Sequence, residues 1–164
     1  MLDLLPDLFD HYSDGLTLLP IRFFSYGKKV IFYGEVVTVQ CIDDNSKVKS
    51  VLSKNGKGKV LVVDGQGSSK ALLGDMIAKS ALENEWEGVI VNGNIRDVMC
   101  IRTLDLGVHA LGTHPMKTQK RGKGDINVSL EIAGINIQPK MWVYADANGV
   151  ALSPRAIDLS VLTE

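Results

Sequence analysis

Two short stretches of the sequence carry residue types that could do chemistry, Gly74-Asp75-Met76-Ile77 and Asn94-Ile95-Arg96-Asp97. Each stretch follows an apolar, strand-like run and opens a helix-like pattern. The carboxyl ends of parallel strands meet at one edge of an open α/β sheet, where such sheets bind ligands. We therefore expect the two stretches to form one site.

Asp75 follows Gly74 at a predicted helix start, where unpaired backbone N–H groups and the helix dipole favour an anion. The stretch from Gly74 to Ile77 is therefore a candidate site for the carboxylate of a small ligand. The alternative is that Asp75 is only a helix N-cap, which its residue type and position favour when taken alone.

Arg96 and Asp97 repeat this arrangement one βα unit later. A guanidinium can hold a carboxylate or keto oxygen with paired donors, and a neighbouring carboxylate can hold a hard cation. The dipeptide therefore suits a metal-chelating oxyacid. Asp97 could equally be a helix cap beside a solvated Arg96, but two such starts at adjacent strand ends favour a shared site.

The elements that must position these residues form a predicted βαβαβ unit in the middle of the chain. Its first strand is the continuous apolar run Val60-Leu61-Val62-Val63, which is typical of a strand covered on both faces. The pattern then predicts, in order, a helix at 75–83, a strand at 88–91, a helix at 97–104 and a strand at 108–111.

Regular patterns also flank this unit. Before it, they predict a helix within 3–12, a long strand at 30–39 and a helix with apolar positions at Val48, Val51 and Leu52. After it, they predict a hairpin of 126–132 with 135–137 and a second hairpin of 142–144 with 150–152. The sequence thus predicts a mixed α/β fold with a β-rich C-terminal half, as a single domain over residues 1–164.

Composition excludes several broad classes. The chain has 164 residues with 18 Lys+Arg against 19 Asp+Glu, so its net charge of -1 provides no general attraction for nucleic acid or an anionic membrane. No apolar run approaches the roughly 20 residues that span a bilayer. The two cysteines show no zinc or redox spacing, which favours a reduced, cytoplasmic setting.

Other reactive residues fit structural roles better. Cys100 lies between Met99 and Ile101, so we predict a buried structural thiol rather than a nucleophile. The histidines are too scattered for a metal cluster; His109, within a strand, is predicted to be a satisfied structural residue, and His114 is a weaker candidate for lining the site. The basic run at 117–123 could bind RNA or an acidic protein, but we predict a solvated loop.

Asp75, twenty intervening residues and then Arg96-Asp97 resemble the signature of the class II 4-hydroxy-4-methyl-2-oxoglutarate aldolases. These enzymes share their fold with the regulator of ribonuclease activity A. The similarity covers nearly the whole chain and includes Val62-Val63-Asp64-Gly65 and Tyr144-Ala145-Asp146-Ala147-Asn148-Gly149. The resemblance implies a swivelling β/β/α fold and a homotrimer with sites at subunit boundaries.

The resemblance also implies roles for single residues. The backbone and side chain at the helix start would hold pyruvate, and these positions are Gly74, Asp75, Met76 and Ile77. Arg96 would contact the keto or enolate oxygen of a small 2-oxoacid, and Asp97 would bind Mg²⁺ or Mn²⁺ directly or through water. With Arg96 and Asp75 as catalytic residues, metal and guanidinium would stabilise pyruvate enolate, released by aldol cleavage or by oxaloacetate decarboxylation.

Two features bear on the choice between reactions and roles. The aldolases use a further acid from a C-terminal extension of a neighbouring subunit, whereas here Asp158 and Glu164 are the only acids after Arg155 and match no motif. Decarboxylation needs no such base. The alternative is a protein that binds and inhibits ribonuclease E without chemistry, but the intact Asp97 beside Arg96 favours the enzyme.

Overall fold

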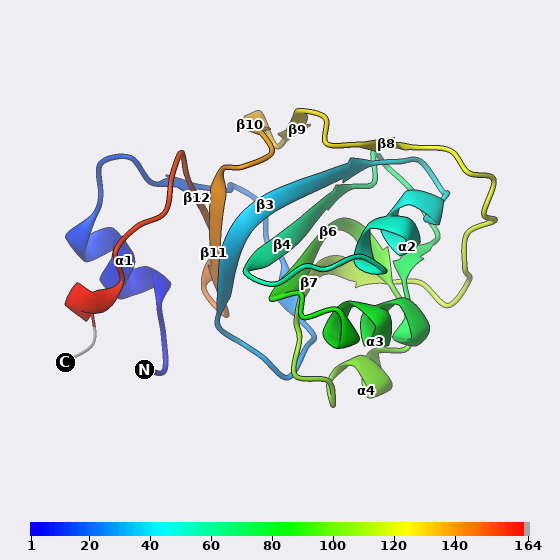
Figure 1. The fold of residues 1–164 in the computed structure, drawn as a ribbon, viewed down its shortest axis with the longest axis horizontal. Helices are drawn as coiled ribbons and strands as arrows, with labels where there is room; N and C mark the ends of the chain where they lie inside the picture. The colour runs from blue at the N-terminus through cyan, green and yellow to red at the C-terminus, as the bar shows by residue number, and fades with distance from the viewer. Residues whose placement is uncertain (163–164) are drawn as a thin grey trace.

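A ten-stranded mixed sheet runs through the computed structural model, which describes residues 1–162 (Figure 1). Its main path has the order β1-β12-β11-β3-β4-β6-β7-β2, and β5 pairs with β6 while β8 pairs with β3. The strands are β1 (Thr17–Leu18), β2 (Phe24–Ser25), β3 (Phe32–Gln40), β4 (Lys59–Asp64), β5 (Ala71–Leu73), β6 (Gly88–Ile95), β7 (Gly107–Thr113), β8 (Asp125–Ile126), β11 (Trp142–Asp146) and β12 (Gly149–Ser153).

The middle of the sheet confirms the predicted βαβαβ unit. Strands β4, β6 and β7 are parallel neighbours, and the chain passes between them through α3 (Asp75–Glu83) and α4 (Val98–Ile101). Helix α2 (Ser46–Leu52) lies beside α3, and all three helices cover one face of the sheet (Figure 1). Helix α4 ends earlier than the predicted residue 104.

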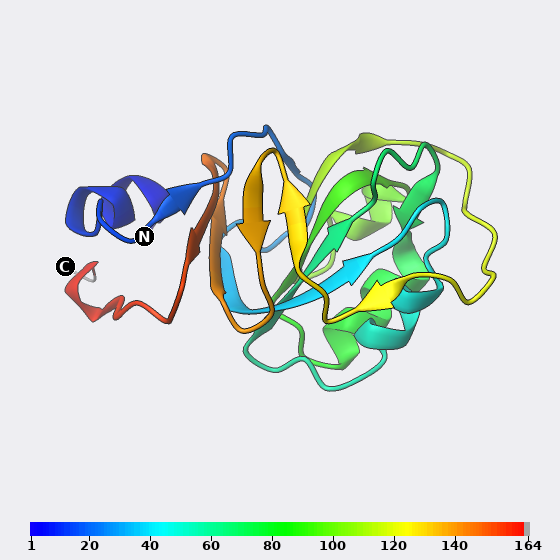
Figure 2. The same cartoon turned by 90° about the horizontal axis from the view of Figure 1, so that it is seen from above.

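Alternate residues of β4 enter two different cores. Leu61 and Val63 pack with the helices, whereas Val60 and Val62 pack with a hairpin on the opposite face. That hairpin consists of β9 (Leu130–Ile132) and β10 (Ile135–Ile137), which form a separate two-stranded sheet (Figure 2). Burial on both faces explains why the apolar run of β4 is continuous.

The predicted strand at 126–132 is wrong in one respect, because the structure divides it. Residues 125–126 form β8 and pair with β3, whereas 130–132 form β9 and pair with β10. Asn127 lies between them with φ of 60°, a left-handed conformation that interrupts an extended strand. The predicted turn at Ala133-Gly134 and the hairpin of β11 with β12 are confirmed.

Helix α1 (Leu5–His11) packs at the end of the molecule away from α2 and α3, beside the short helix η1 (Ser160–Leu162) (Figure 1). The carboxylate of Asp146, at the end of β11, accepts hydrogen bonds from the backbone N–H groups of Leu4 and Leu5, both at 2.8 Å. This buried carboxylate therefore connects the first helix to the last hairpin.

The helices of the described part of the chain are short. The longest among residues 1–162 is α3, with nine residues, whereas a bilayer requires about 20. No helix formed by these residues is both long and apolar enough to cross a membrane.

Candidate active site

The two predicted site stretches lie side by side because β5 and β6 end together. Leu73 pairs with Ile95 in parallel register, and the backbone N–H of Arg96 donates to the carbonyl of Leu73 at 2.9 Å. Gly74 and Arg96 thus leave the same edge of the sheet, as predicted. The three-residue strand β5, which places Gly74 there, was not predicted.

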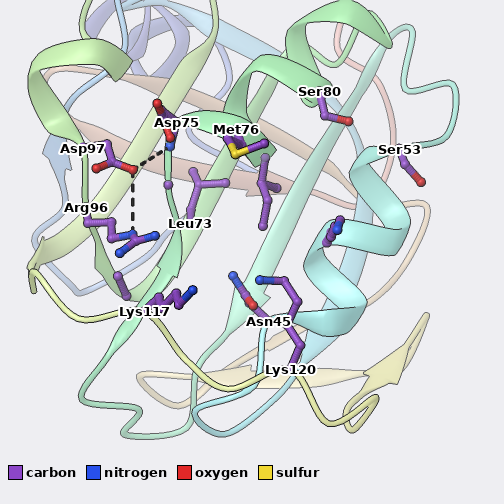
Figure 3. A pocket seen from close by; sticks show the side chains of 14 residues that line it. Asn45, Ser53, Leu73, Asp75, Met76, Ser80, Arg96, Asp97, Lys117 and Lys120 are labelled. Carbon is purple, nitrogen blue, oxygen red and sulfur yellow. Dashed lines mark hydrogen bonds and ion pairs between the residues drawn. The ribbon is translucent and has the colours of Figure 1, made fainter.

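Asp97 connects the two stretches through one carboxylate oxygen. Its Oδ2 accepts a hydrogen bond from the backbone N–H of Asp75 at 3.0 Å and lies 3.7 Å from Nε of Arg96 (Figure 3). Asp97 has φ of 58° and immediately precedes α4, but its side chain makes no capping hydrogen bond to that helix. Asp97 therefore occupies the N-cap position of α4, as the alternative expected, but its carboxylate binds the start of α3 instead of capping α4.

Asp75 is not an N-cap. Gly74 holds the N-cap position of α3, and Asp75 is the first helical residue. The Asp75 carboxylate lies 3.9 Å from Nζ of Lys79 and is 37% exposed, so it faces the solvent near the pocket. Its backbone N–H, which an incoming anion could use, is held by Asp97 in this structure.

A pocket of about 310 Å³ opens at this junction, between the start of α3 and one face of α2 (Figure 3). All of the predicted site residues line it, namely Gly74, Asp75, Met76, Ile77, Arg96 and Asp97. The structure thus brings the predicted set together around one cavity large enough for a small organic acid.

Three lysines also line the pocket, and none was predicted as a site residue. Lys49 comes from α2, and Lys117 and Lys120 come from the loop between β7 and β8. That loop is exposed, as predicted, but it also forms a wall of the site. No carboxylate within residues 1–162 forms an ion pair with these lysines. One sequence signal was available, since Asn45, Lys49 and Ser53 are spaced to share a polar face of α2.

The balance of charge indicates an anionic ligand. Lys49, Lys117, Lys120 and Arg96 place four cations on the wall, against the two carboxylates of Asp75 and Asp97. Because the Asp97 carboxylate already contacts Arg96, the ammonium groups are the free charges of the pocket. A ligand with more than one carboxylate would complement this arrangement.

The donor set restricts which metal ion the site could hold. No group of three or more His, Cys, Asp or Glu side chains within residues 1–162 is arranged to hold a metal. Asp97 is 37% exposed and offers an accessible carboxylate at the pocket. Such a sparse oxygen set suits Mg²⁺, which keeps several waters, and not the tetrahedral nitrogen and sulfur sites of zinc.

The structure corrects the prediction for His109. It lies in β7 and is buried, as expected, but neither ring nitrogen has a hydrogen-bond partner among the described residues. The ring lies against Phe32 in an edge contact, with 5.1 Å between centroids, and near Phe23. Burial lowers the pKa of His109 to about 4, so the imidazole is neutral at pH 7.

Two further candidates lie outside the pocket. His114 does not line it; its Nδ1 accepts a hydrogen bond from the backbone N–H of Met116 at 3.1 Å. Cys100 is partly exposed, so the prediction of a buried thiol is wrong for this residue. Cys41 is the buried cysteine, and burial raises its pKa to about 12.

Asp158, one of the two C-terminal acids, does not line the pocket. Asp158 is exposed and lies near α1, where its backbone carbonyl accepts a hydrogen bond from the Tyr12 hydroxyl at 3.0 Å. This is the end of the molecule away from α3 (Figure 1). Glu164 lies outside the described residues.

A family model and a curated relative both match nearly the whole chain and agree on its family. A family model described as RraA-like, Aldolase/RraA, matches residues 5–152. A protein of Shewanella oneidensis named "Putative 4-hydroxy-4-methyl-2-oxoglutarate aldolase" is 56% identical over 163 residues, which cover 99% of each chain.

Two solved structures agree closely with the fold. A structure described as an S-adenosylmethionine:2-dimethylmenaquinone methyltransferase from Geobacillus kaustophilus has a TM-score of 0.91 at 42% identity, covering 94% of this chain and 97% of that one. The RNA-processing inhibitor RraA from Thermus thermophilis has a TM-score of 0.91 at 38% identity, covering 96% of both chains. These relatives bear different functional names on one fold, so function must be argued from the site.

Proposed function

This chain belongs to the RraA-like family, and from that premise we propose that it is a carbon–carbon lyase that depends on a divalent metal ion and forms pyruvate enolate. Its reactions are aldol cleavage of 4-hydroxy-4-methyl-2-oxoglutarate, decarboxylation of oxaloacetate, or both. The observation that carries the proposal is the convergence of Arg96, Asp97 and the start of α3 on one pocket.

The start of α3 binds the carboxylate next to the keto group in this proposal. The first N–H groups of a helix lack partners within the helix, and the dipole favours negative charge there. Asp97 now occupies the N–H of Asp75 with its own carboxylate oxygen, which supports the use of this position by an anion. If the Asp97 carboxylate held a cation instead, this N–H would be available to the substrate.

Asp97 is the residue that would hold Mg²⁺ or Mn²⁺, because its carboxylate is accessible at the pocket. When bound, the cation supplies Lewis-acid polarisation of the keto group. Arg96 donates hydrogen bonds to the same keto oxygen and stabilises the negative charge that develops on it. The Nε atom of Arg96 lies 3.7 Å from Oδ2 of Asp97, the proposed cation ligand, which supports this role.

Both reactions break the bond between C3 and C4 of the substrate, and the electron pair moves toward the C2 oxygen to give the enolate. In aldol cleavage the C4 hydroxyl must also lose its proton, as the second product gains a carbonyl. In decarboxylation the C4 carboxylate leaves as CO₂, so no hydroxyl base is needed. Asp158 is the only acid after Arg155 in the part of the chain that the structure describes, and it lies near α1, away from the pocket; this favours decarboxylation as the reaction of one chain.

The pocket lysines suit the second carboxylate that both substrates carry. Lys49, Lys117 and Lys120 provide ammonium groups that have no carboxylate partner within residues 1–162. The same charge argues against methyl transfer from S-adenosylmethionine, because its sulfonium is a cation and would be repelled by this wall.

The proposed assembly is a cytoplasmic homotrimer with sites at subunit boundaries. Exposed methionines support a partner surface near the site. Met76 on α3, Met99 on α4 and Met116 before Lys117 are 80%, 68% and 55% exposed. A second subunit covering them could also supply the hydroxyl base for aldol cleavage.

The test is turnover by purified protein with Mg²⁺ or Mn²⁺. Loss of oxaloacetate and release of pyruvate from 4-hydroxy-4-methyl-2-oxoglutarate should both be followed, and a chelator should abolish activity. If the metal-loaded protein is no faster than free metal ion with either substrate, the proposed function is wrong.

A second candidate function is inhibition of ribonuclease E by protein binding without chemistry. The close fold and 38% identity shared with the Thermus RNA-processing inhibitor favour it. The two functions separate in the Asp97→Ala variant. An inhibitor that keeps only a vestigial site should bind ribonuclease E equally well with and without this carboxylate.

A further inference from the structure

The loop between β7 and β8 carries Lys120 to the pocket. This loop is hydrogen-bonded to the buried carboxylate of Asp44, which lies in the connection between β3 and α2. We propose that Asp44 is a positioning residue that holds Lys120 where it binds the second carboxylate of the substrate. This inference rests on the proposed function, and it concerns how the dicarboxylate is recognised.

Asp44 uses both carboxylate oxygens to connect two segments. Its Oδ2 accepts hydrogen bonds from the backbone N–H groups of Arg121 at 2.9 Å and Lys123 at 3.1 Å. Its Oδ1 accepts from the backbone N–H and the hydroxyl of Ser46, at 2.9 and 2.5 Å. Asp44 is only 3% exposed, so replacing one of its carboxylate oxygens would remove a hydrogen-bond acceptor that is shielded from solvent.

Two neighbouring contacts complete the attachment. The Asn45 side chain accepts a hydrogen bond from the Thr118 hydroxyl at 2.9 Å, and the Thr118 residue is 2% exposed. The Ser46 hydroxyl accepts from the backbone N–H of Gly122 at 3.0 Å. Residues on both sides of Lys120 are therefore bound to the segment that precedes α2.

Lys120 itself is held by none of these contacts. Its side chain is exposed at the pocket and has no carboxylate partner within residues 1–162. Its place thus depends on the backbone anchors at Thr118 and Arg121, whose partners are Asn45 and Asp44. Fixing the backbone in advance reduces the entropy lost when a flexible lysine binds a ligand.

Lys117 provides an internal comparison, because a different element holds it. It forms an isolated parallel bridge with Ala71 of β5, and the backbone N–H of Ala71 donates to the carbonyl of Met116 at 2.9 Å. Asp44 makes no hydrogen bond to this part of the loop. A change at Asp44 should therefore affect Lys120 and leave Lys117 in place.

The experiment compares Asp44→Asn with Asp43→Asn, which removes the same charge one residue away. The Asp43 carboxylate accepts a hydrogen bond from the backbone N–H of Lys70, and within residues 1–162 it makes no hydrogen bond or ion pair with the loop between β7 and β8. We expect Asp44→Asn to raise KM for oxaloacetate about tenfold, as for one lost hydrogen bond to a charged group, with kcat within about twofold. Asp43→Asn should change neither constant.

Proton exchange of pyruvate distinguishes a positioning role from a merely structural one, because general damage to the site would slow this exchange as well. Pyruvate has a single carboxylate, and exchange of its methyl protons in deuterated water reports enolate formation without the second carboxylate. Asp44→Asn should leave this exchange unchanged. An equal loss of pyruvate exchange and oxaloacetate turnover would show general damage to the site and overturn the positioning role.

A double-mutant cycle tests whether Asp44 acts through Lys120. Lys120→Gln should raise KM for oxaloacetate, and adding Asp44→Asn should raise it little further, because coupled residues are not additive. The matched cycle with Lys117→Gln should be additive. Additivity in the Lys120 cycle would contradict the proposal.

Limited proteolysis measures the anchor without any substrate. Trypsin should cut after Lys120 and Arg121 faster in Asp44→Asn than in the wild type, and unchanged cleavage would overturn the anchoring role. If Asp44→Asn is unfolded by circular dichroism, Ser46→Ala removes the acceptor of Gly122 and serves in the same assays. A wild-type protein that turns over neither substrate nor exchanges pyruvate protons would disprove the proposed function, while this cleavage test still decides the anchor.

Discussion

The carboxylate of Asp97 accepts a hydrogen bond from the backbone N–H of Asp75 at 3.0 Å, across the junction of two βα units. This contact connects the metal-ligand candidate to the anion-binding helix start. In the proposed function, substrate and Asp97 would therefore compete for the same N–H group. Metal binding at Asp97 is expected to favour substrate binding, because it would release the N–H group of Asp75.

Removal of the Asp97 carboxylate should separate metal binding from the rest of the site. We expect Asp97→Ala to abolish stimulation of oxaloacetate decarboxylation by Mg²⁺ or Mn²⁺, measured as rate against metal concentration. Asp105→Ala is the control, because Asp105 is an exposed acid after α4. An unchanged metal response in Asp97→Ala would exclude this residue as the ligand.

Arg96 should act on the transition state. Replacing it by alanine removes the donors to the developing enolate oxygen, and we expect kcat to fall by roughly 10²–10³. Arg102→Ala is a suitable control, since Arg102 is an exposed arginine that contacts the sulfur of Met99 at 3.5 Å. Wild-type kcat in Arg96→Ala would rule out the assigned role.

A glycine is needed at position 74 because a side chain there would crowd the Asp97 carboxylate, and not because of its backbone angles. Its φ of -131° and ψ of -171° are open to any residue, but a Cβ would lie 2.8 Å from Oδ2 of Asp97. Gly74→Val should therefore raise KM for oxaloacetate by about tenfold, or about 1.4 kcal/mol of binding. Met76→Leu should leave KM nearly unchanged, because Met76 is 80% exposed and the swap conserves volume. A folded Gly74→Val variant with normal kinetics would place the ligand elsewhere.

His109 should make the protein sensitive to mild acid. Its pKa is lowered from 6.5 to about 4 in the folded state, so the unfolded state binds the proton more readily. The contribution of the neutral His109 imidazole to stability is fully present above pH 6.5 and is lost as the pH falls toward 4. This shift predicts a loss of about 2 kcal/mol in the free energy of unfolding between pH 7 and pH 5.

Urea unfolding of the wild type and His109→Leu at both pH values measures this effect. The variant should lose much less stability over the same interval. Asp44 and Asp146 do not obscure the result, because their pKa values are lowered from 3.8 and their stabilising effect is lost below that range. If His109→Leu showed the same pH dependence of stability as the wild type, groups other than His109 would be responsible for it.

Asp146 should contribute to stability through α1. Asp146→Ala leaves the N–H groups of Leu4 and Leu5 without their acceptor, and we expect a loss of about 2–4 kcal/mol in the free energy of unfolding. Asp3→Asn is the control, since Asp3 is exposed and its carboxylate, within residues 1–162, accepts a hydrogen bond only from the Asn148 side chain. Denaturant unfolding of both variants measures the difference; equal stability would remove Asp146 as the anchor.

The sequence predicts the centre of this fold well because its signals are local. The apolar run of β4 and the helical pattern of α3 each lie within one short window. The position of Arg96 and Asp97 at the pocket likewise follows from their place directly after a strand. Strand β5 could not be predicted in this way, because three residues form no periodic pattern and its pairing with β6 is a tertiary contact.

The missed site residues depend on contacts between distant parts of the chain. Lys120 reaches the pocket because Asp44 binds the backbone of Arg121, 77 positions away in the sequence. The unpaired state of His109 likewise depends on Phe23 and Phe32 closing over its ring. No pattern within β7 distinguishes such a ring from a satisfied one.

The bond between Leu4 and Asp146 also determines when the N-terminal helix can form during synthesis. The two residues are separated by 142 positions. Helix α1 has seven residues, too few to be stable without tertiary contacts. At translation speeds of about 5–20 residues per second, its acceptor emerges on the order of ten seconds after the helix does. We therefore expect helix α1 to be one of the last elements to fold, with its apolar face uncovered on the nascent chain until β11 is made.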